Sequence, residues 1–301
     1  MEQSVVDVKD LSRSFGDKTA LDRVSFRATA GQVYGLVGSN GAGKTTLLKH
    51  LLGLLRPTTG SVRIFGLDPV RDPVGALGRI GYLSEEHELP EWMRIDELMR
   101  YTQAFHPTWD AAYARELLET FALDPSSKVK DLSKGMRAQT GLIAAVAHRP
   151  ELLILDEPSS GLDAVVRRDI LDAIVRAVAD DGRTVIFSSH LLDEVERMSD
   201  HVTMIHQGRV TLSGALDDVR GSYQRSRVHF VDHLDRAPVL DTALAMDGGG
   251  RSWTVIHSGP IEQFRRSAGA RGGEIVESRD ATLEEIFLAR AGRSRQHTEV
   301  A

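Results

Sequence analysis

The residues Gly38-Ser39-Asn40-Gly41-Ala42-Gly43-Lys44-Thr45 decide the fold of this chain. They match G-x-x-x-x-G-K-[ST], follow an apolar stretch over 32–37 that is typical of a strand, and open a helix predicted over 44–55. In such a unit the glycines let backbone N–H groups surround a phosphate, while Lys44 supplies positive charge and the Thr45 hydroxyl can bind Mg²⁺. The alternative is a glycine-rich turn with an incidental lysine, which the flanking strand and helix disfavour. The residues expected at the phosphates are Ser39, Asn40, Gly41, Ala42, Gly43, Lys44, Thr45 and Thr46.

Two further apolar strands, predicted over 152–155 and 184–187, end in reactive side chains. Asp156 and Glu157 follow the first strand, and His190 follows the second. Because side chains alternate along a strand, one carboxylate can serve Mg²⁺ while the other holds a water. Taken alone, the carboxylates would be solvated charges and the histidine structural. The phosphate loop upstream favours the functional interpretation, since ligands of open α/β folds gather at the carboxyl ends of the strands.

Composition excludes several classes of protein. The chain has 301 residues, a formal net charge of −6, 27% charged residues and no cysteine. A disulfide scaffold, a thiolate metal site and cysteine catalysis are therefore excluded, and a strongly basic nucleic-acid binder is disfavoured. We expect no cleavable leader in residues 1–30 and no membrane span, because no apolar run approaches the roughly 18 residues that a span needs.

The pattern along the chain predicts two domains. Strands and helices alternate over 1–217, with a predicted edge strand carrying Val5, Val8 and Leu11 and a helical insertion over about 86–149. A hairpin over 202–212 is expected to close this domain. Residues 218–301 predict a small second domain with balanced charge, 12 arginines against 12 acidic residues, and a capping box in Thr282–Glu285 that opens a helix.

The motifs together resemble one family, the ATP-binding subunits of ABC transporters. Leu132-Ser-Lys-Gly-Met136 stands in the place of the LSGGQ signature and Ser160-Gly-Leu-Asp163 in that of the D-loop. The order agrees as well, because Ser133 lies 23 residues before Asp156 and His190 lies 34 after it. The resemblance covers roughly residues 1–215. It implies an α/β P-loop NTPase fold with a mixed sheet, a helical subdomain and a small C-terminal α+β extension.

The resemblance also implies ATP and Mg²⁺ as cofactors and a dimer that sandwiches two nucleotides. Each nucleotide would be held by the phosphate loop of one subunit and by Ser133, Gly135 and Asp163 of the other. By analogy, Glu157 polarises the attacking water, His190 contacts the γ-phosphate and Phe15 stacks on adenine. Thr45, Asp156 and Glu85 are the expected metal ligands. Two departures from the family stand out: Glu85 replaces the usual Q-loop glutamine, and Lys134 replaces the first glycine of the signature. The sequence leaves open whether Lys134 adds positive charge near the opposite nucleotide or faces solvent.

Several features are similar to bacterial exporters of drugs and antibiotics, among them the L-S-K-G-M signature, Glu85 and the ending over 281–288. This implies a peripheral ATPase on the cytoplasmic face of the membrane. The ATPase would dimerise, and a homodimer is favoured over a heterodimer. It would drive export through a separately encoded transmembrane permease, whose coupling helix would enter a groove formed by Glu85 and residues 91–105. Three alternatives stay open: a soluble ABC ATPase acting on ribosomes or nucleic acid, an importer subunit, and a nucleotide-binding regulator that does not hydrolyse ATP.

Overall fold

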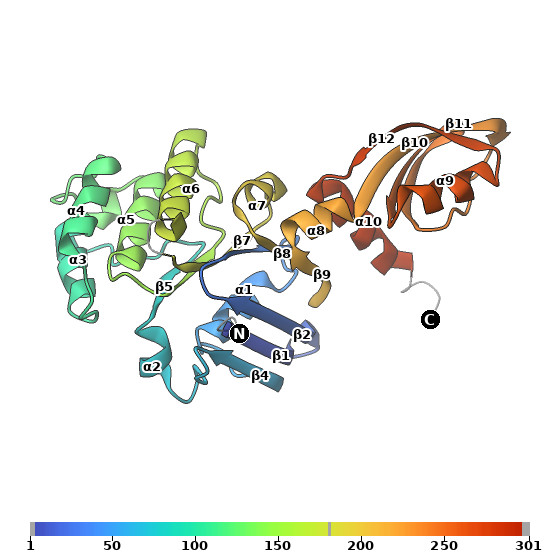
Figure 1. The fold of residues 1–301 in the computed structure, drawn as a ribbon. Helices are drawn as coiled ribbons and strands as arrows, with labels where there is room; N and C mark the ends of the chain where they lie inside the picture. Colours follow the sequence, from blue (N-terminus) through green and yellow to red (C-terminus); the bar gives the residue numbers. More distant parts are fainter. Residues whose placement is uncertain (1–3, 180–181, 297–301) are drawn as a thin grey trace. The chain divides into compact units, whose positions relative to one another are not determined.

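The computed structural model describes residues 4–179 and 182–296, which form two compact units (Figure 1). The units are Met1–Leu212 and Ser213–Ala301. The division falls inside strand β9 (Arg209–Ala215), five residues before the expected boundary at 217. Each unit has its own apolar core.

The first unit begins with an antiparallel sheet of order β2-β1-β4, made of β1 (Ser4–Phe15), β2 (Lys18–Thr29) and β4 (Thr59–Ile64). The prediction of an edge strand was wrong, since β1 pairs with β2 on one side and with β4 on the other. Only the middle strand of this sheet has both edges paired. The sequence could not reveal this, because β4 lies more than forty residues downstream and joins β1 only in the folded chain.

A six-stranded sheet of order β5-β6-β7-β3-β8-β9 forms the rest of the framework. Strands β5 (Ile80–Leu83), β6 (Leu152–Asp156), β7 (Thr184–Ser189), β3 (Val33–Val37) and β8 (His201–His206) pair in parallel. Every residue of β3, β6 and β7 is buried. This explains their continuous apolar sequences, because a parallel strand is covered on both faces.

Helix α1 (Lys44–Leu51) packs between the two sheets. Its Leu47, Leu48 and Leu51 are fully buried and share one core with residues of β1, β2, β3 and β6. Burying each of these side chains contributes about 2 kcal/mol to stability. The helix end that carries the phosphate loop is therefore fixed to both sheets.

The chain between β5 and β6 is helical. It contains α3 (Ile95–Gln103), α4 (Ala111–Thr120), a short 3-10 helix (Val129–Asp131) and α5 (Lys134–Val146), which lie together in Figure 1. The remaining helices of this unit are α2 (Pro73–Leu77), α6 (Ala164–Ala179) and α7 (Leu192–Met198). None of the helices, so far as the chain is described, is long and apolar enough to cross a bilayer.

The second unit is α+β. Its antiparallel sheet has the order β11-β10-β12, from β10 (Tyr223–Leu234), β11 (Ala243–Ser258) and β12 (Gly273–Asp280). Helices α8 (Leu216–Gly221), α9 (Ile261–Gly269) and α10 (Leu283–Gln296) complete it, with Phe230, Trp253 and Phe264 in the core. The predicted capping box is confirmed: the Glu285 carboxylate accepts from the Thr282 N–H, and the Thr282 hydroxyl accepts from the Glu285 N–H.

Candidate active site

Close packing explains the glycines at both ends of the phosphate loop. A Cβ on Gly38 would lie 2.4 Å from the Ile205 carbonyl oxygen, and one on Gly43 would lie 2.7 Å from that of Ala20. Gly43 also has a φ of 114°, which side chains with a Cβ rarely adopt. Any other residue at these two positions would displace the backbone that is expected to surround a phosphate.

Lys44 and His190 both contact the carboxylate of Glu157. The Lys44 ammonium lies 3.0 Å from Oε1 of Glu157 and donates to the Gly38 carbonyl at 2.7 Å. Oε2 of Glu157 lies 2.7 Å from Nδ1 of His190. Lys44 and Glu157 are almost completely buried, whereas His190 is partly exposed. Glu157 has a φ of 48°, so the chain turns sharply after β6 and directs this carboxylate back to the phosphate loop.

Ser188 connects the ends of β6 and β7. Its buried hydroxyl donates to Oδ1 of Asp156 at 2.6 Å and accepts from the Glu157 N–H at 2.9 Å. A single hydroxyl therefore holds the carboxylate of Asp156 and the backbone of Glu157. This role cannot be predicted from the sequence, because a serine in an apolar strand carries no motif and its partners lie 31 and 32 residues away.

A pocket of about 420 Å³ opens in front of the phosphate loop. Ten of the predicted residues line it: Phe15, Asn40, Gly41, Ala42, Gly43, Lys44, Thr45, Thr46, Glu85 and Glu157. Phe15 is 46% exposed, and the Arg13 guanidinium lies 4.7 Å from the centroid of its ring, so a planar ligand can stack on the part of the ring that Arg13 leaves open. Lys18, which no sequence motif marks, lines the pocket as a second cation. Ser39, Asp156 and His190 do not line it, although Asp156 is held by Ser188 and His190 by Glu157.

Ser133, Gly135 and Asp163 do not line this pocket either. The Ser133 hydroxyl caps α5 by accepting from the Met136 N–H, and the Asp163 carboxylate caps α6 by accepting from the Val165 and Val166 N–H groups. Gly135 packs so closely that a Cβ would lie 3.1 Å from methyl carbons of Val166. The signature segment therefore contacts Val166 in the first turn of α6, the helix that follows the D-loop. If these residues bind a nucleotide, it is not the one in the pocket of their own chain.

Lys134 of the signature also lies close to the D-loop. Gly161 has no Cβ, but a Cβ placed there would lie 2.5 Å from the ammonium nitrogen of Lys134. The sequence left open whether this lysine faces solvent or an opposite nucleotide. In the structure its side chain is exposed and its charged end lies over the D-loop of its own chain.

Comparison with known proteins identifies the family. The profile described as "ABC transporter" matches residues 21–160. The chain is 32% identical to the daunorubicin resistance ATP-binding protein DrrA3 of Streptomyces coeruleorubidus, over all of both chains. It is 33% identical to the bacitracin transport ATP-binding protein BcrA of Bacillus licheniformis, over 96% of this chain and 98% of that protein. The chain belongs to the ABC transporter ATP-binding proteins.

Solved structures agree with this assignment. A structure titled "Structure of ATP binding subunit of ABC transporter" is 32% identical to the chain and superposes with a TM-score of 0.67, over 72% of this chain and 92% of that one. The predicted α/β P-loop NTPase fold is thereby confirmed, and with it the assignment of the chain as an ABC ATPase.

A buried carboxylate outside the family motifs also organises this ABC ATPase. Glu194 on α7 is 1% exposed and accepts hydrogen bonds from Ser159 and Ser189, at 2.6 and 2.9 Å, and from Arg167 at 2.6 Å. Ser159 precedes the D-loop and Ser189 precedes His190. Glu194 therefore ties these two segments to each other and to α6. No sequence motif marks Glu194, because its partners lie 35, 27 and 5 residues away along the chain.

The three residues expected to bind metal suit a magnesium ion that would share its coordination with a nucleotide. Thr45, Glu85 and Asp156 line one continuous groove beside the phosphate loop. No group of three or more His, Asp or Glu side chains in the described part of the chain could hold a metal by itself. This fits Mg²⁺, which is usually held by one or two carboxylates together with substrate phosphates. Burial and the nearby Asp156 carboxylate raise the pKa of Tyr82 to about 12, so its hydroxyl stays neutral.

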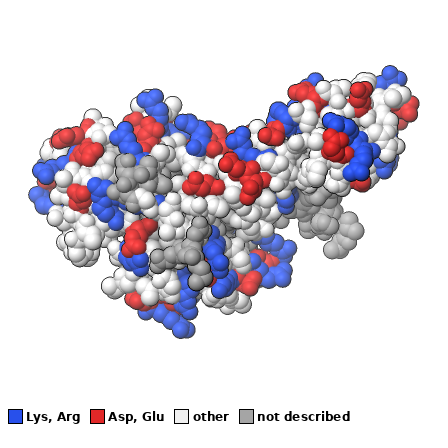
Figure 2. Space-filling model, in the orientation of Figure 1, with Lys and Arg blue, Asp and Glu red and all other residues white. Residues whose placement is uncertain are grey.

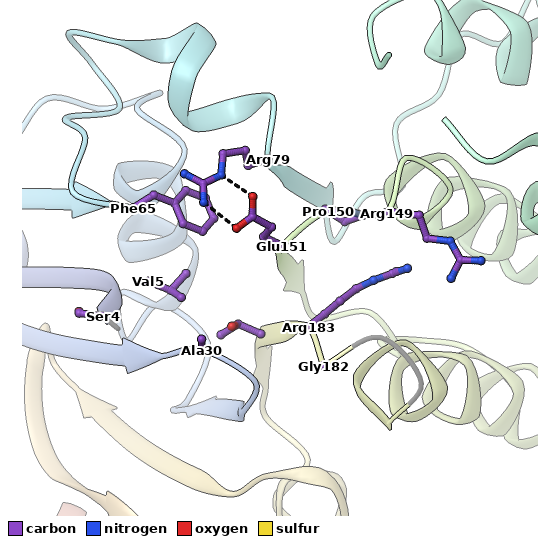
Figure 3. A pocket seen from close by; sticks show the side chains of 11 residues that line it. Ser4, Val5, Ala30, Phe65, Arg79, Arg149, Pro150, Glu151, Gly182 and Arg183 are labelled. Atoms are coloured by element: carbon purple, nitrogen blue, oxygen red, sulfur yellow. Dashed lines mark hydrogen bonds and ion pairs between the residues drawn. The ribbon is translucent and has the colours of Figure 1, made fainter. Parts of the chain in front are cut away.

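A second pocket, of about 400 Å³, lies at the opposite ends of the parallel strands (Figure 3). Its arginines are engaged by the protein: Arg79 pairs with both oxygens of Glu151 and covers the Phe65 ring, whereas Arg149 pairs with Asp110. In Figure 3, Arg149 and Arg183 extend away from the Arg79–Glu151 pair. We therefore assign no ligand to this pocket.

Proposed function

We propose that the chain is the nucleotide-binding subunit of a bacterial exporter. It binds Mg·ATP, dimerises around two nucleotides and hydrolyses them, and drives export through a separately encoded transmembrane permease at the cytoplasmic face of the membrane. The observation that carries the proposal is the position of the Glu157 carboxylate, 3.0 Å from the Lys44 ammonium and 2.7 Å from His190. A carboxylate at the phosphate loop can orient and activate a water for attack on the γ-phosphate.

In this mechanism ATP binding breaks the contact between Lys44 and Glu157. The ammonium of Lys44 binds the phosphates instead, and the N–H groups of residues 39–46 surround the phosphates. Glu157, still held by His190, then accepts a hydrogen bond from the attacking water and takes up its proton. Thr45, Asp156 and Glu85 would hold Mg²⁺, whose positive charge would offset the negative charge of the phosphates.

The second subunit completes the site. Ser133 caps α5, so the positive end of this helix and the serine hydroxyl can face a γ-phosphate across a dimer interface. Gly135 and Asp163 belong to segments that reach no nucleotide in their own chain, which supports the same arrangement. A homodimer is the simplest assembly, because one chain carries one complete set of motifs.

Export is supported by relatives that cover nearly the whole chain, since one is named for daunorubicin resistance and another for bacitracin transport. The charge distribution also agrees, because basic and acidic side chains are interspersed over the face shown in Figure 2. No extended basic surface appears on this face, and this favours a protein partner over nucleic acid.

The proposal is tested with Glu157→Gln. The variant should bind ATP, hydrolyse it at less than about a hundredth of the normal rate and accumulate as an ATP-bound dimer in size-exclusion chromatography. Glu151→Gln, at the other end of β6, is the matched control and should hydrolyse ATP normally. Wild-type turnover by Glu157→Gln would remove this carboxylate from catalysis.

Two more changes separate binding from dimerisation. Lys44→Ala should abolish nucleotide binding. Ser133→Arg should leave binding by the single subunit intact and prevent the dimer, whereas Thr120→Arg on α4 should dimerise normally. Normal dimers of Ser133→Arg would contradict the nucleotide sandwich.

The partner is tested by affinity purification of the tagged chain from detergent-solubilised native membranes. Recovery of a multispanning membrane protein in comparable amount supports the transporter assignment. Recovery of ribosomal or DNA-bound proteins without a membrane protein would favour a soluble ABC ATPase instead.

A further inference from the structure

A pocket of about 570 Å³ lies in the first unit between β4 and the loop that leads to α2. It is separate from the nucleotide pocket, because the two have no lining residue in common. Three arginines line it: Arg56 before β4, Arg63 on β4 and Arg71 after it. We call it the arginine pocket. None of its residues belongs to the phosphate loop, the signature, the D-loop or the strand ends that carry the reactive side chains.

The arginines are only partly compensated. Asp68 is the one acidic residue among the lining residues that the structure describes. Its Oδ2 lies 3.1 Å from Nη1 of Arg63 and 3.7 Å from Nε of Arg71. Arg56 is exposed, and no carboxylate of the described residues forms an ion pair with it. This differs from Arg79, whose guanidinium is matched by both oxygens of Glu151.

The remaining titratable residue of the lining adds no charge. His50, on α1, is 1% exposed, and burial lowers its pKa. The imidazole is therefore neutral at pH 7. With three arginines and one aspartate, the arginine pocket has a net charge of two positive units.

Two of the positive charges converge on one point. Because the guanidinium groups of Arg63 and Arg71 reach the same oxygen of Asp68, they lie close to each other. A guanidinium has five N–H donors, and Asp68 engages one nitrogen of each group, so donors remain for a further acceptor. The Asp68 carboxylate is itself held by the Val70 N–H, which donates to Oδ1 at 3.0 Å.

The rest of the wall supplies a hydroxyl and apolar surface. Ser61 lies two residues before Arg63, so both side chains belong to the face of β4 opposite the core. The apolar part of the lining consists of Pro57, Val62, Pro69 and Val70. The volume falls in the range of roughly 300–1,000 Å³ that is usual for small-molecule sites. The pocket can therefore hold a charged group together with the carbon atoms attached to it.

These features select an anion with its charge concentrated on one group. A carboxylate carries one negative charge, whereas a phosphate monoester carries about −1.5 to −2 at pH 7 and has three acceptor oxygens. Such a group can accept from several guanidinium groups at once. We propose that the arginine pocket binds a phosphate monoester, with the carbon-containing part of the ligand against the apolar wall. Soluble phosphorylated compounds and the headgroup of phosphatidic acid both present this group. The inference is independent of the proposed function, since it concerns a site apart from the nucleotide.

Hydrogen–deuterium exchange of the full chain locates the ligand. Glycerol phosphate, a soluble monoester, should slow the exchange of backbone amides over 56–71. Occupation of the nucleotide pocket would instead protect residues 38–46, so the two sites are distinguished. Dimethyl phosphate, a diester with a single charge, should need a concentration about tenfold higher for the same protection. Equal protection by the monoester and the diester would contradict the charge match.

A pair of substitutions tests the arginines. Arg56→Gln combined with Arg71→Gln removes the uncompensated charge and keeps the contact between Arg63 and Asp68. It should weaken protection of 56–71 by glycerol phosphate at least about tenfold, because charge-assisted hydrogen bonds are lost. The matched control is Arg115→Gln with Arg197→Gln, on α4 and α7, which makes the same change in net charge and should behave like the wild type. ATP binding by both variants verifies their folding, and equal protection in the two would refute the proposal.

Vesicles separate the two sources of the ligand. If the source is a lipid, phosphatidylcholine vesicles that contain phosphatidic acid should protect 56–71, and vesicles that contain the diester phosphatidylglycerol should not. The Arg56→Gln, Arg71→Gln variant should lose this protection. Protection by glycerol phosphate alone supports the proposal with a soluble ligand, and protection by the phosphatidic acid vesicles alone supports it with a lipid. If neither probe protects 56–71, the proposal is overturned.

Discussion

The contact between Lys44 and Glu157 predicts a measurable energetic coupling in the nucleotide-free protein. The charged atoms lie 3.0 Å apart and both side chains are 6% exposed, so the attraction is about 5 kcal/mol at an effective dielectric constant of about 20. Desolvation of the two buried groups cancels much of this gain. Removing one partner alone leaves the other charge buried, and this accounts for most of the expected loss.

We expect Lys44→Met to lower the free energy of unfolding by about 3 kcal/mol. Glu157→Gln should cost less, about 1 kcal/mol, because the amide oxygen can still accept from Lys44. The double variant should be about 2 kcal/mol more stable than the sum of the two losses predicts.

The assay is urea unfolding followed by tryptophan fluorescence in a Trp253→Phe background. Trp253 is the one tryptophan of the second unit, so only Trp92 and Trp109 then report, and both belong to the first unit. Arg79→Met with Glu151→Gln, an exposed pair at the other end of β6, is the matched control and should show coupling below about 1 kcal/mol. Additive losses for Lys44 and Glu157 would refute the reasoning, because they would mean that the two side chains do not pair in the free protein.

Three further predictions follow from the same geometry. Ser188→Ala should lower the free energy of unfolding by about 2 kcal/mol in urea titration and slow hydrolysis more than tenfold, because Asp156 and Glu157 lose their shared hydroxyl; normal turnover would contradict that role. Phe15→Ala should weaken ATP binding about tenfold in a titration with fluorescent nucleotide, whereas Phe15→Tyr should not; equal affinities would exclude stacking. Burial lowers the pKa of His257 to about 4 in the folded state, below the unfolded value of about 6.5. The unfolded chain therefore binds the extra proton, and the second unit should lose up to about 3 kcal/mol as the pH falls from about 6.5 to 4, as followed by Trp253 fluorescence. His257→Gln should flatten this dependence, and an unchanged profile would exclude His257 as its source.

The sequence by itself determined the family, the phosphate loop and the strands that carry the reactive residues. These features are local: the glycines are needed for the turn, and the fully buried strands β3, β6 and β7 require continuous apolar sequence. The same holds for the capping box at Thr282, whose two hydrogen bonds span only three residues. Signals of this kind can be read without knowledge of distant contacts.

Only the tertiary structure decided which residues pair across the chain. Ser188 reaches Asp156 and Glu157 because β6 and β7 are neighbours in register, and Glu194 reaches Ser159 and Ser189 because α7 packs back on the strand ends. The central position of β1 and the approach of Lys134 to Gly161 depend in the same way on segments far apart in sequence. A serine, a lysine or a glutamate has no fixed role until folding determines which groups surround it and which of its charges remain unpaired.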